Sequence, residues 1–176
     1  MIAELEADHR EIQEIFARMS LAPAAGRKDL VHEVTIALVR HSMAEQAHLY
    51  PAVRARILDG DRLADEEVAD HARVERMLKD LEGRPPAGAG FGRLLRTLVR
   101  EVGLHIQDEE QRLFPALASV AAPEELERLG EQVRAMRVLA PTRPHPDLPS
   151  SPTARRLLAP GIGLVDRVRD YVSGRG

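Results

Sequence analysis

The sequence predicts an all-α protein: an antiparallel, up-down-up-down four-helix bundle with a short fifth helix and an extended proline-rich tail. Three observations indicate this fold. Apolar residues recur at intervals of three and four over four long segments, which is the periodicity of one helix face. Prolines and glycines separate these segments by short connections, as between antiparallel neighbours in a bundle. The sequence contains no strand-like alternation of β-branched residues.

Local signals bound each helix. The first segment ends at a loop containing Pro23 and Gly26, and Asp29 is the expected N-cap of the second helix. The second helix ends at Asp59-Gly60-Asp61 after a proline, and the third ends at Gly83. The expected helices cover residues 2–19, 29–58, 64–81, 94–117 and 124–139.

The composition changes at Pro141. Six of the 12 prolines lie between Pro141 and Pro160, which predicts an extended segment that either wraps on the bundle or moves freely. A last amphipathic turn is expected near residues 165–172. We therefore expect two parts, a bundle over residues 1–140 and a proline-rich extension over residues 141–176.

The overall composition excludes several classes of protein. There is no cysteine, so disulfides and thiolate metal sites are excluded, and any metal must be held by imidazole and carboxylate. A net charge of -3 gives no reason to expect a nucleic-acid partner. The N-terminus lacks the basic and apolar regions of a signal peptide, and no stretch has the length of a membrane span. We expect a cytoplasmic protein that does not contact a membrane.

One short pattern occurs twice in the chain. His41-x-x-x-Glu45 is followed by Leu49-Tyr50-Pro51, and His105-x-x-x-Glu109 is followed by Leu113-Phe114-Pro115. A spacing of four places each His and Glu on one helix face, which is how a helix offers two ligands to one metal. An Asp-His pair precedes each copy, at residues 8–9 and 70–71.

The histidines and glutamates of this pattern fall within the apolar stripes of the helices, where an ionised carboxylate stays buried only when it is paired or bound to metal. They also fall at one level, because residues at equal depth in antiparallel helices lie symmetrically about the connecting loop. The midpoints of His9 and His41, of Glu45 and His71, and of His71 and His105 are positions 25, 58 and 88, at or near the three loops. The predicted metal ligands are His9, His41, Glu45, His71, His105 and Glu109.

The alternative is that these histidines are structural. A single core histidine is more often held by a hydrogen bond than by a metal, but four histidines and two glutamates at matched depth on four helices favour one metal site. Three further residues are weaker metal candidates: His48, Tyr50 and Glu75. Tyr50 lies off the ideal face of Glu45, but Pro51 removes a helical hydrogen bond and would allow it to turn inward. Glu110 is expected to point away from the site.

At these residues the chain resembles the hemerythrin-like, or HHE cation-binding, family. The matching elements are the two Asp-His pairs and the two copies of the His-x-x-x-Glu pattern with their Leu-aromatic-Pro, which span roughly residues 1–120. The tail resembles the proline-rich C-terminal extensions of actinobacterial members.

The resemblance implies an oxo- or hydroxo-bridged centre of two irons inside the bundle. Nitrogens would come from His9, His41, His71 and His105, and carboxylates from Glu45 and Glu109. Oxygen-carrying hemerythrins have a histidine where this chain has Glu75, and an aspartate where it has Glu110. A site richer in carboxylates favours ferric iron, and with it chemistry on peroxide, oxygen or nitric oxide rather than reversible oxygen carriage.

Three functions are therefore consistent with the sequence. The leading hypothesis is a non-haem di-iron protein that reacts with small oxidants, most concretely hydrogen peroxide, in a catalase-like dismutation. The alternative is a module that binds or senses oxygen, nitric oxide or iron without turnover. A third interpretation is a metal-free helical interaction protein. Imidazole and carboxylate ligands also suit manganese or a mixed centre, so the assignment of iron depends on the resemblance.

Overall fold

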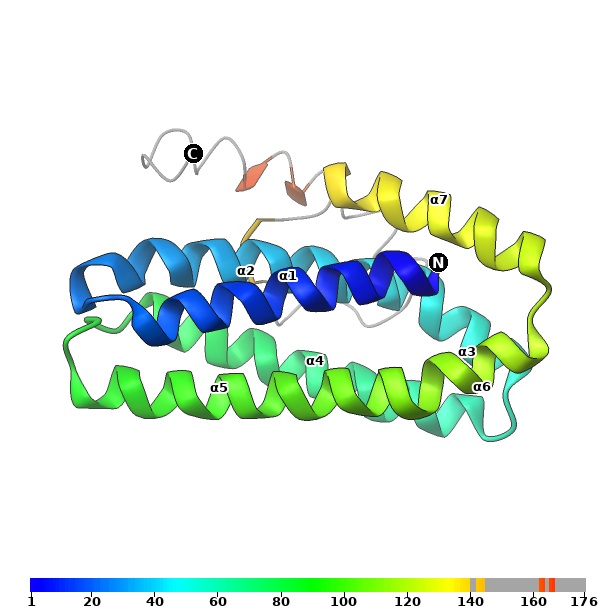
Figure 1. Ribbon diagram of the computed structural model, residues 1–176, viewed down its shortest axis with the longest axis horizontal. Helices are drawn as coiled ribbons and strands as arrows, with labels where there is room; N and C mark the ends of the chain where they lie inside the picture. The colour runs from blue at the N-terminus through cyan, green and yellow to red at the C-terminus, as the bar shows by residue number, and fades with distance from the viewer. Residues whose placement is uncertain (140–141, 145–161, 164, 167–176) are drawn as a thin grey trace.

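The computed structural model of the chain describes residues 1–139, 142–144, 162–163 and 165–166, and within these residues every regular element is helical. The bundle is formed by α1 (Ile2–Leu21), α2 (Arg27–Ala44), α4 (Gly60–Glu82) and α5 (Ala89–Asp108), which lie side by side in Figure 1. Short helices α3 (Tyr50–Arg56) and α6 (Phe114–Val120) continue α2 and α5. This arrangement confirms the predicted all-α bundle.

The fifth helix, α7 (Pro123–Leu139), contacts α1 and α2 and lies along their side of the bundle in Figure 1. The amino group of Met1 donates a hydrogen bond to the Leu126 carbonyl at 2.7 Å. Gly130 permits this approach, because a Cβ there would lie 2.6 Å from the Met1 nitrogen. The first residue of the chain is therefore fixed against α7.

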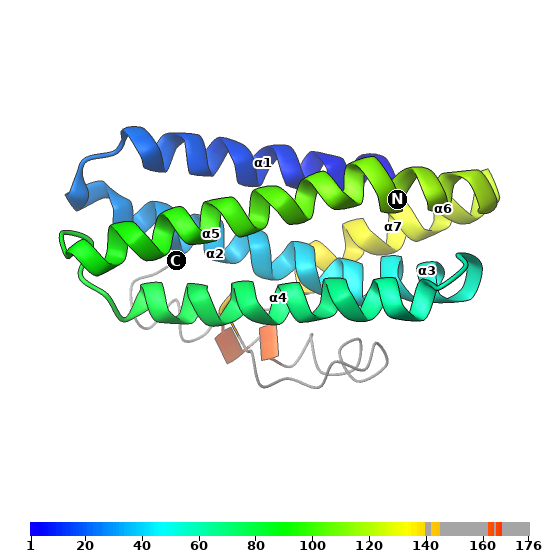
Figure 2. The ribbon, with the colours of Figure 1, turned by 90° about the horizontal axis from the view of Figure 1, so that it is seen from below.

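The connections lie where the ligand spacing predicted them, between α1 and α2, between α3 and α4, and between α4 and α5 (Figure 2). One boundary differs from the prediction. Asp29 does not cap α2, because the 3₁₀ turn η1 (Ala24–Gly26) runs directly into a helix that begins at Arg27. Asp29 instead lies in the first turn, where its charge interacts favourably with the helix dipole.

A π-helical segment lies at the same place in each copy of the repeated pattern. These segments are η2 (Glu45–Leu49), between α2 and α3, and η3 (Glu109–Leu113), between α5 and α6. Each is followed by an aromatic residue and a proline, Pro51 or Pro115. Proline has no N–H and its ring crowds the carbonyl four residues earlier, so a locally widened helix accommodates it.

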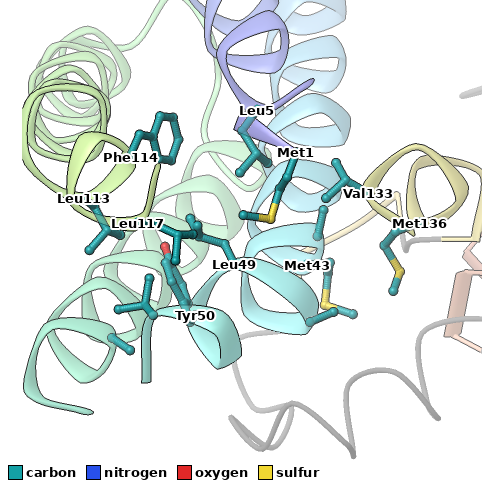
Figure 3. Close-up of a cluster of buried hydrophobic side chains, with 14 of the residues drawn as sticks. Met1, Leu5, Met43, Leu49, Tyr50, Leu113, Phe114, Leu117, Val133 and Met136 are labelled. Carbon is teal, nitrogen blue, oxygen red and sulfur yellow. The ribbon is translucent and has the colours of Figure 1, made fainter. Parts of the chain in front are cut away.

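Two apolar clusters fill the interior, one on each side of a layer of polar residues. The N-terminal cluster packs around Met1, Leu5, Leu49 and Phe114, and Figure 3 shows its side chains gathered between α1, α3, α6 and α7. The second cluster lies toward the opposite end of the bundle. Its fully buried members include Ile12, Met19, Val34, Leu78, Phe91 and Leu98. The predicted metal ligands occupy the layer between the two clusters.

A carboxylate holds together the part of the tail that the structure describes. The Asp166 carboxylate accepts hydrogen bonds from the backbone N–H groups of Thr142 and Arg143, at 3.2 and 3.1 Å. The rest of the predicted proline-rich segment and most of the predicted last turn lie outside the described residues, so the division at residue 141 stays a prediction. None of the helices in the described part is long and apolar enough to cross a membrane.

Candidate metal centre

Four imidazoles meet in two pairs in the middle of the bundle. Nε2 of His9 on α1 lies 3.2 Å from Nε2 of His41 on α2. Nε2 of His71 on α4 lies 3.0 Å from Nε2 of His105 on α5. Each ring is at most 7% exposed. We refer to these pairs as the His9–His41 half-site and the His71–His105 half-site.

Two glutamates lie between the half-sites, and each contacts both. The Glu45 Oε2 atom is 3.1 Å from His41 Nε2 and 3.2 Å from His71 Nε2. The Glu109 Oε2 atom is 3.4 Å from His9 Nε2 and 3.6 Å from His105 Nε2. Both carboxylates are fully buried. All six residues expected from the sequence therefore meet at one place, with their potential ligand atoms within a few ångströms of each other.

The outward-facing nitrogen of each histidine has its own polar neighbour. His9 Nδ1 lies 2.8 Å from Glu110 Oε1, and His105 Nδ1 lies 2.8 Å from Glu67 Oε2. His71 Nδ1 lies 3.0 Å from the Gln46 amide nitrogen, and His41 Nδ1 lies 3.8 Å from Asp8 Oδ2. The three short contacts fix the rotation of the His9, His71 and His105 rings about the Cβ–Cγ bond, so that Nε2 faces the centre.

Sequence reasoning missed most of these neighbours. The expectation that Glu110 points away is wrong, because the π-helical course of η3 brings its carboxylate back to His9. Glu67 carried a usable signal, since it lies four residues before His71 in the same stripe. Gln46 carried none. Asp70, the aspartate of the second Asp-His pair, instead forms an ion pair with Arg73 near the surface.

Tyr50 reaches the centre and is fully buried. Its hydroxyl lies 3.2 Å from His71 Nε2 and donates a hydrogen bond to Glu109 Oε1 at 3.0 Å. The Tyr50 backbone N–H bonds to the Glu45 carbonyl, five residues earlier, so the π-helical turn places the phenol above Glu45. The proline effect anticipated from the sequence therefore operates through this widened turn.

The two other weaker candidates are buried but lie further from the convergence. Glu75 lines a cavity of ≈ 20 Å³ together with His41, His71 and His105, a space for about one water molecule. His48 lies within η2. Among the described residues, neither belongs to a group whose ligand atoms lie close enough together to share an ion.

The buried charges shift the protonation of the site. Burial and the negative charge of Glu109 raise the pKa of Glu45 well above its ordinary value. Burial also opposes ionisation of Glu109, but the positive charge of His105 outweighs it and lowers the pKa of Glu109 overall. Without metal, Glu45 therefore keeps its proton to a higher pH than Glu109 does, because two like charges this close together repel each other in a buried site.

The pKa values of His41 and His105 are also shifted in opposite directions. Burial lowers the pKa of His41, so its ring is neutral at neutral pH. Burial acts in the same direction on His105, but the charges of Glu109 and Glu67 outweigh it and raise the pKa of His105 to about 9. Burial raises the pKa of Glu67 to about 7, against the opposing effect of His105. The metal-free site therefore holds protons where a cation would otherwise bind.

Two buried carboxylate oxygens without a hydrogen-bond donor also indicate that these residues suit a metal ion. Glu45 Oε1 and Glu109 Oε2 are buried, and neither accepts a hydrogen bond from any described side chain. Buried carboxylate oxygens of this kind are costly unless a cation or a donor satisfies them. Four imidazole nitrogens and two carboxylates form a ligand set typical of iron or manganese.

Comparison with known proteins assigns the family. The family model described as Hemerythrin HHE cation binding domain matches residues 1–117, with a second, overlapping match at residues 70–142. The chain belongs to this hemerythrin HHE family. The two overlapping matches agree with the duplicated pattern, since the second begins just before His71.

Two relatives described as HHE-domain or hemerythrin-like proteins match this chain over most of their own length. A crystal structure of an HHE cation binding domain-containing protein from Mycobacterium kansasii superposes with a TM-score of 0.68 at 27% identity, over 77% of this chain and 83% of that one. An uncharacterised hemerythrin-like protein of Schizosaccharomyces pombe is 25% identical over 94% of this chain and 82% of its own length. A DNA nickase of Nostoc is 23% identical over 76% of this chain, which corresponds to only 38% of that protein.

Proposed function

We propose that this HHE chain holds two iron ions between its four bundle helices and reacts there with small oxidants, most concretely hydrogen peroxide. The observation that carries the proposal is the convergence of four buried imidazoles and two buried carboxylates in two adjacent half-sites. Without a metal, the buried negative charge of this site is offset by protons on Glu45 and His105, and a bound cation would take over that role. We also propose that the protein acts in the cytoplasm.

Each half-site would hold one iron through its two imidazoles, and Glu45 and Glu109, which each contact both half-sites, would supply carboxylate ligands. Tyr50 is placed to be a further ligand, or to keep its proton and donate a hydrogen bond at the centre. Two bound irons supply the exchange of two electrons that peroxide dismutation requires. Carboxylates with opposite pKa shifts supply positions that accept and return protons.

The surrounding side chains restrict what enters. The cavity beside the half-sites is walled by apolar residues of all four bundle helices, including Ile12, Leu38, Val74 and Val102. Its volume of ≈ 20 Å³, about that of one water molecule, suits a small ligand. On the other face, Phe114 stacks on His9 with ring centroids 5.7 Å apart, which keeps that ring in place. These walls favour peroxide, oxygen or nitric oxide as the ligand.

The test is to load metal-free protein with ferrous iron without oxygen, measure bound iron, and then follow oxygen evolution from peroxide. We expect about two irons per chain and turnover above that of the same amount of free iron. His41→Gln should lower both values, whereas His32→Gln, on the same helix but outside the centre, should leave them unchanged. Failure to bind metal would refute the centre; two bound irons without oxygen evolution would refute the peroxide reaction alone.

A second candidate function is a sensor without turnover, and one chain of contacts favours it. Asp8 lies 3.8 Å from His41 Nδ1 and also pairs with Arg137 of α7 at 2.5 Å. A change in the ligation of His41 would therefore reach α7 directly. Hydrogen exchange of α7 that differs between oxidised and reduced iron-loaded protein would support sensing, and identical exchange would exclude it.

A supercoiled plasmid in the peroxide assay tests for DNA nicking, which the net charge of -3 disfavours.

A further inference from the structure

The two half-sites differ at one residue of the repeated pattern. In both copies, the residue directly after the glutamate reaches Nδ1 of a histidine on a neighbouring helix. In the first copy Gln46 reaches His71, and in the second copy Glu110 reaches His9. One half-site therefore has an amide neighbour where the other has a carboxylate.

The remaining two neighbours are carboxylates in both half-sites. Asp8 lies 3.8 Å from Nδ1 of His41, and Glu67 lies 2.8 Å from Nδ1 of His105. The half-sites therefore differ in the kind of neighbouring group only at Gln46 and Glu110, although the Glu67 contact is closer than the Asp8 contact. Gln46 is 1% exposed, and the Glu110 side chain is 38% exposed, but Glu110 makes a short contact with a fully buried ring.

The chemical consequence follows from what each group can donate. An ionised carboxylate only accepts hydrogen bonds, so Glu110 fixes the proton of His9 on Nδ1 and leaves the Nε2 lone pair facing the centre. It also makes the imidazole a stronger electron donor. Metal can therefore bind at His9 without a change of tautomer.

Gln46 has the opposite effect on His71. Its amide nitrogen lies 3.0 Å from His71 Nδ1 and can only donate, so Nδ1 is the acceptor in this arrangement. Nε2 of the same ring lies 3.2 Å from both Glu45 Oε2 and the Tyr50 hydroxyl. A metal at His71 needs the Nε2 lone pair, and a neutral ring then carries its proton on Nδ1, so the amide must rotate until its oxygen accepts from Nδ1.

The grouping of ligand atoms points the same way. His9, His41, Glu45 and Glu109 offer four atoms that lie within 4.8 Å of each other. The groups that contain His71 or His105 offer three such atoms each, within the described residues. The His9–His41 half-site is the better formed before any metal arrives.

We infer that the two half-sites fill in order, with the His9–His41 half-site binding the first divalent metal ion more tightly, and that the pair Glu110 and Gln46 sets this order. The inference rests on the two-metal centre of the proposed function. It assigns Glu110 and Gln46 as positioning residues, which act on metal affinity through the histidine that each one contacts.

The test is a titration of the metal-free full-length chain with cobalt(II). This divalent ion serves as a probe of metal affinity that needs no redox reaction. Calorimetry should show two binding steps whose affinities differ by about tenfold or more. Crystals soaked with one equivalent should show anomalous density mainly between His9 and His41. Equal density at both half-sites would overturn the inference.

Variants separate a positioning role from a structural one. Glu110→Gln should weaken the tight step by about 10- to 100-fold, and Gln46→Glu should strengthen the weak step. In the double variant the first cobalt should move to the His71–His105 half-site, which a merely structural role would not produce. Glu101→Gln, two turns earlier on α5 and paired with Arg100, is the matched control and should change neither step.

The outcomes distinguish the inference from the proposed function. Wild-type protein that binds no cobalt and no ferrous iron would overturn both. Two bound cobalt ions with affinities unchanged in Glu110→Gln would overturn the inference and leave the two-metal centre intact. If Gln46→Glu does not fold, because it buries a carboxylate, Glu110→Gln decides alone: the two steps should then converge.

Discussion

In the metal-free protein, His105 is a protonated imidazole between two carboxylates, and its titration should dominate the pH dependence of stability above pH 6.5. Burial lowers its pKa, but Glu109 and Glu67 raise it from 6.5 to about 9. Because the folded state then binds a proton that the unfolded state has lost, stability is fully present below pH 6.5 and decreases as pH rises through 9. The difference of about 2.5 pH units corresponds to about 3 kcal/mol.

The measurement is urea denaturation of chelator-treated protein at several pH values from 6.5 to 9.5. His105→Leu should remove most of the slope in this range, since no proton is then taken up on folding at that position. Saturating metal should remove it as well, because a histidine bound to metal is neutral and metal affinity rises with pH. Metal-free stability that is constant or increases between pH 6.5 and 9 would refute the assigned ion pair of His105 with Glu67 and Glu109.

Three further predictions concern packing, the phenol and metal linkage. Gly60→Ala should lower the unfolding free energy by at least ~2 kcal/mol, because its Cβ would lie 2.2 Å from the Val53 carbonyl oxygen. Gly26→Ala is the control: its Cβ would meet open space, so the unfolding free energy should stay within ~0.5 kcal/mol of wild type in the same denaturation assay. Tyr50→Phe should cost the metal-free protein about 2 kcal/mol, since it removes a buried hydrogen bond to Glu109, and an unchanged value would show that this bond contributes nothing. Metal at 100 times its dissociation constant should raise the unfolding free energy by about 2.7 kcal/mol, and thermal denaturation with and without chelator checks this.

The sequence anticipated the level at which the ligands meet, for a geometric reason. A spacing of four residues fixes a shared face, and symmetry about each loop fixes a shared depth, so His9, His41, His71 and His105 could be brought together without coordinates. The hydrogen-bond partners of Nδ1 could not be derived in this way. Those partners depend on the rotation of each helix about its own axis, which is set by packing against all of its neighbours at once.

The two π-helical segments show where spacing arguments fail. Counting at the α-helical period places Tyr50 beside the ligand face and turns Glu110 away from it. The widened turns at η2 and η3 change the phase of everything that follows, and both residues then reach the centre. The prolines that follow these turns signalled a disturbance of the helix, but not whether it would be a kink, a break or a π-helical turn.

The amino-acid sequence by itself determined the all-α bundle, its loops, its family resemblance and the six residues at the centre, because these depend on periodicity and on the chemistry of side chains. Tertiary structure alone decided how the six are arranged. It divided the histidines into two half-sites, placed Glu45 and Glu109 between them, and gave His9 a carboxylate neighbour where His71 has an amide. Those features are contacts between different helices, and the distances that define them exist only once the helices have packed.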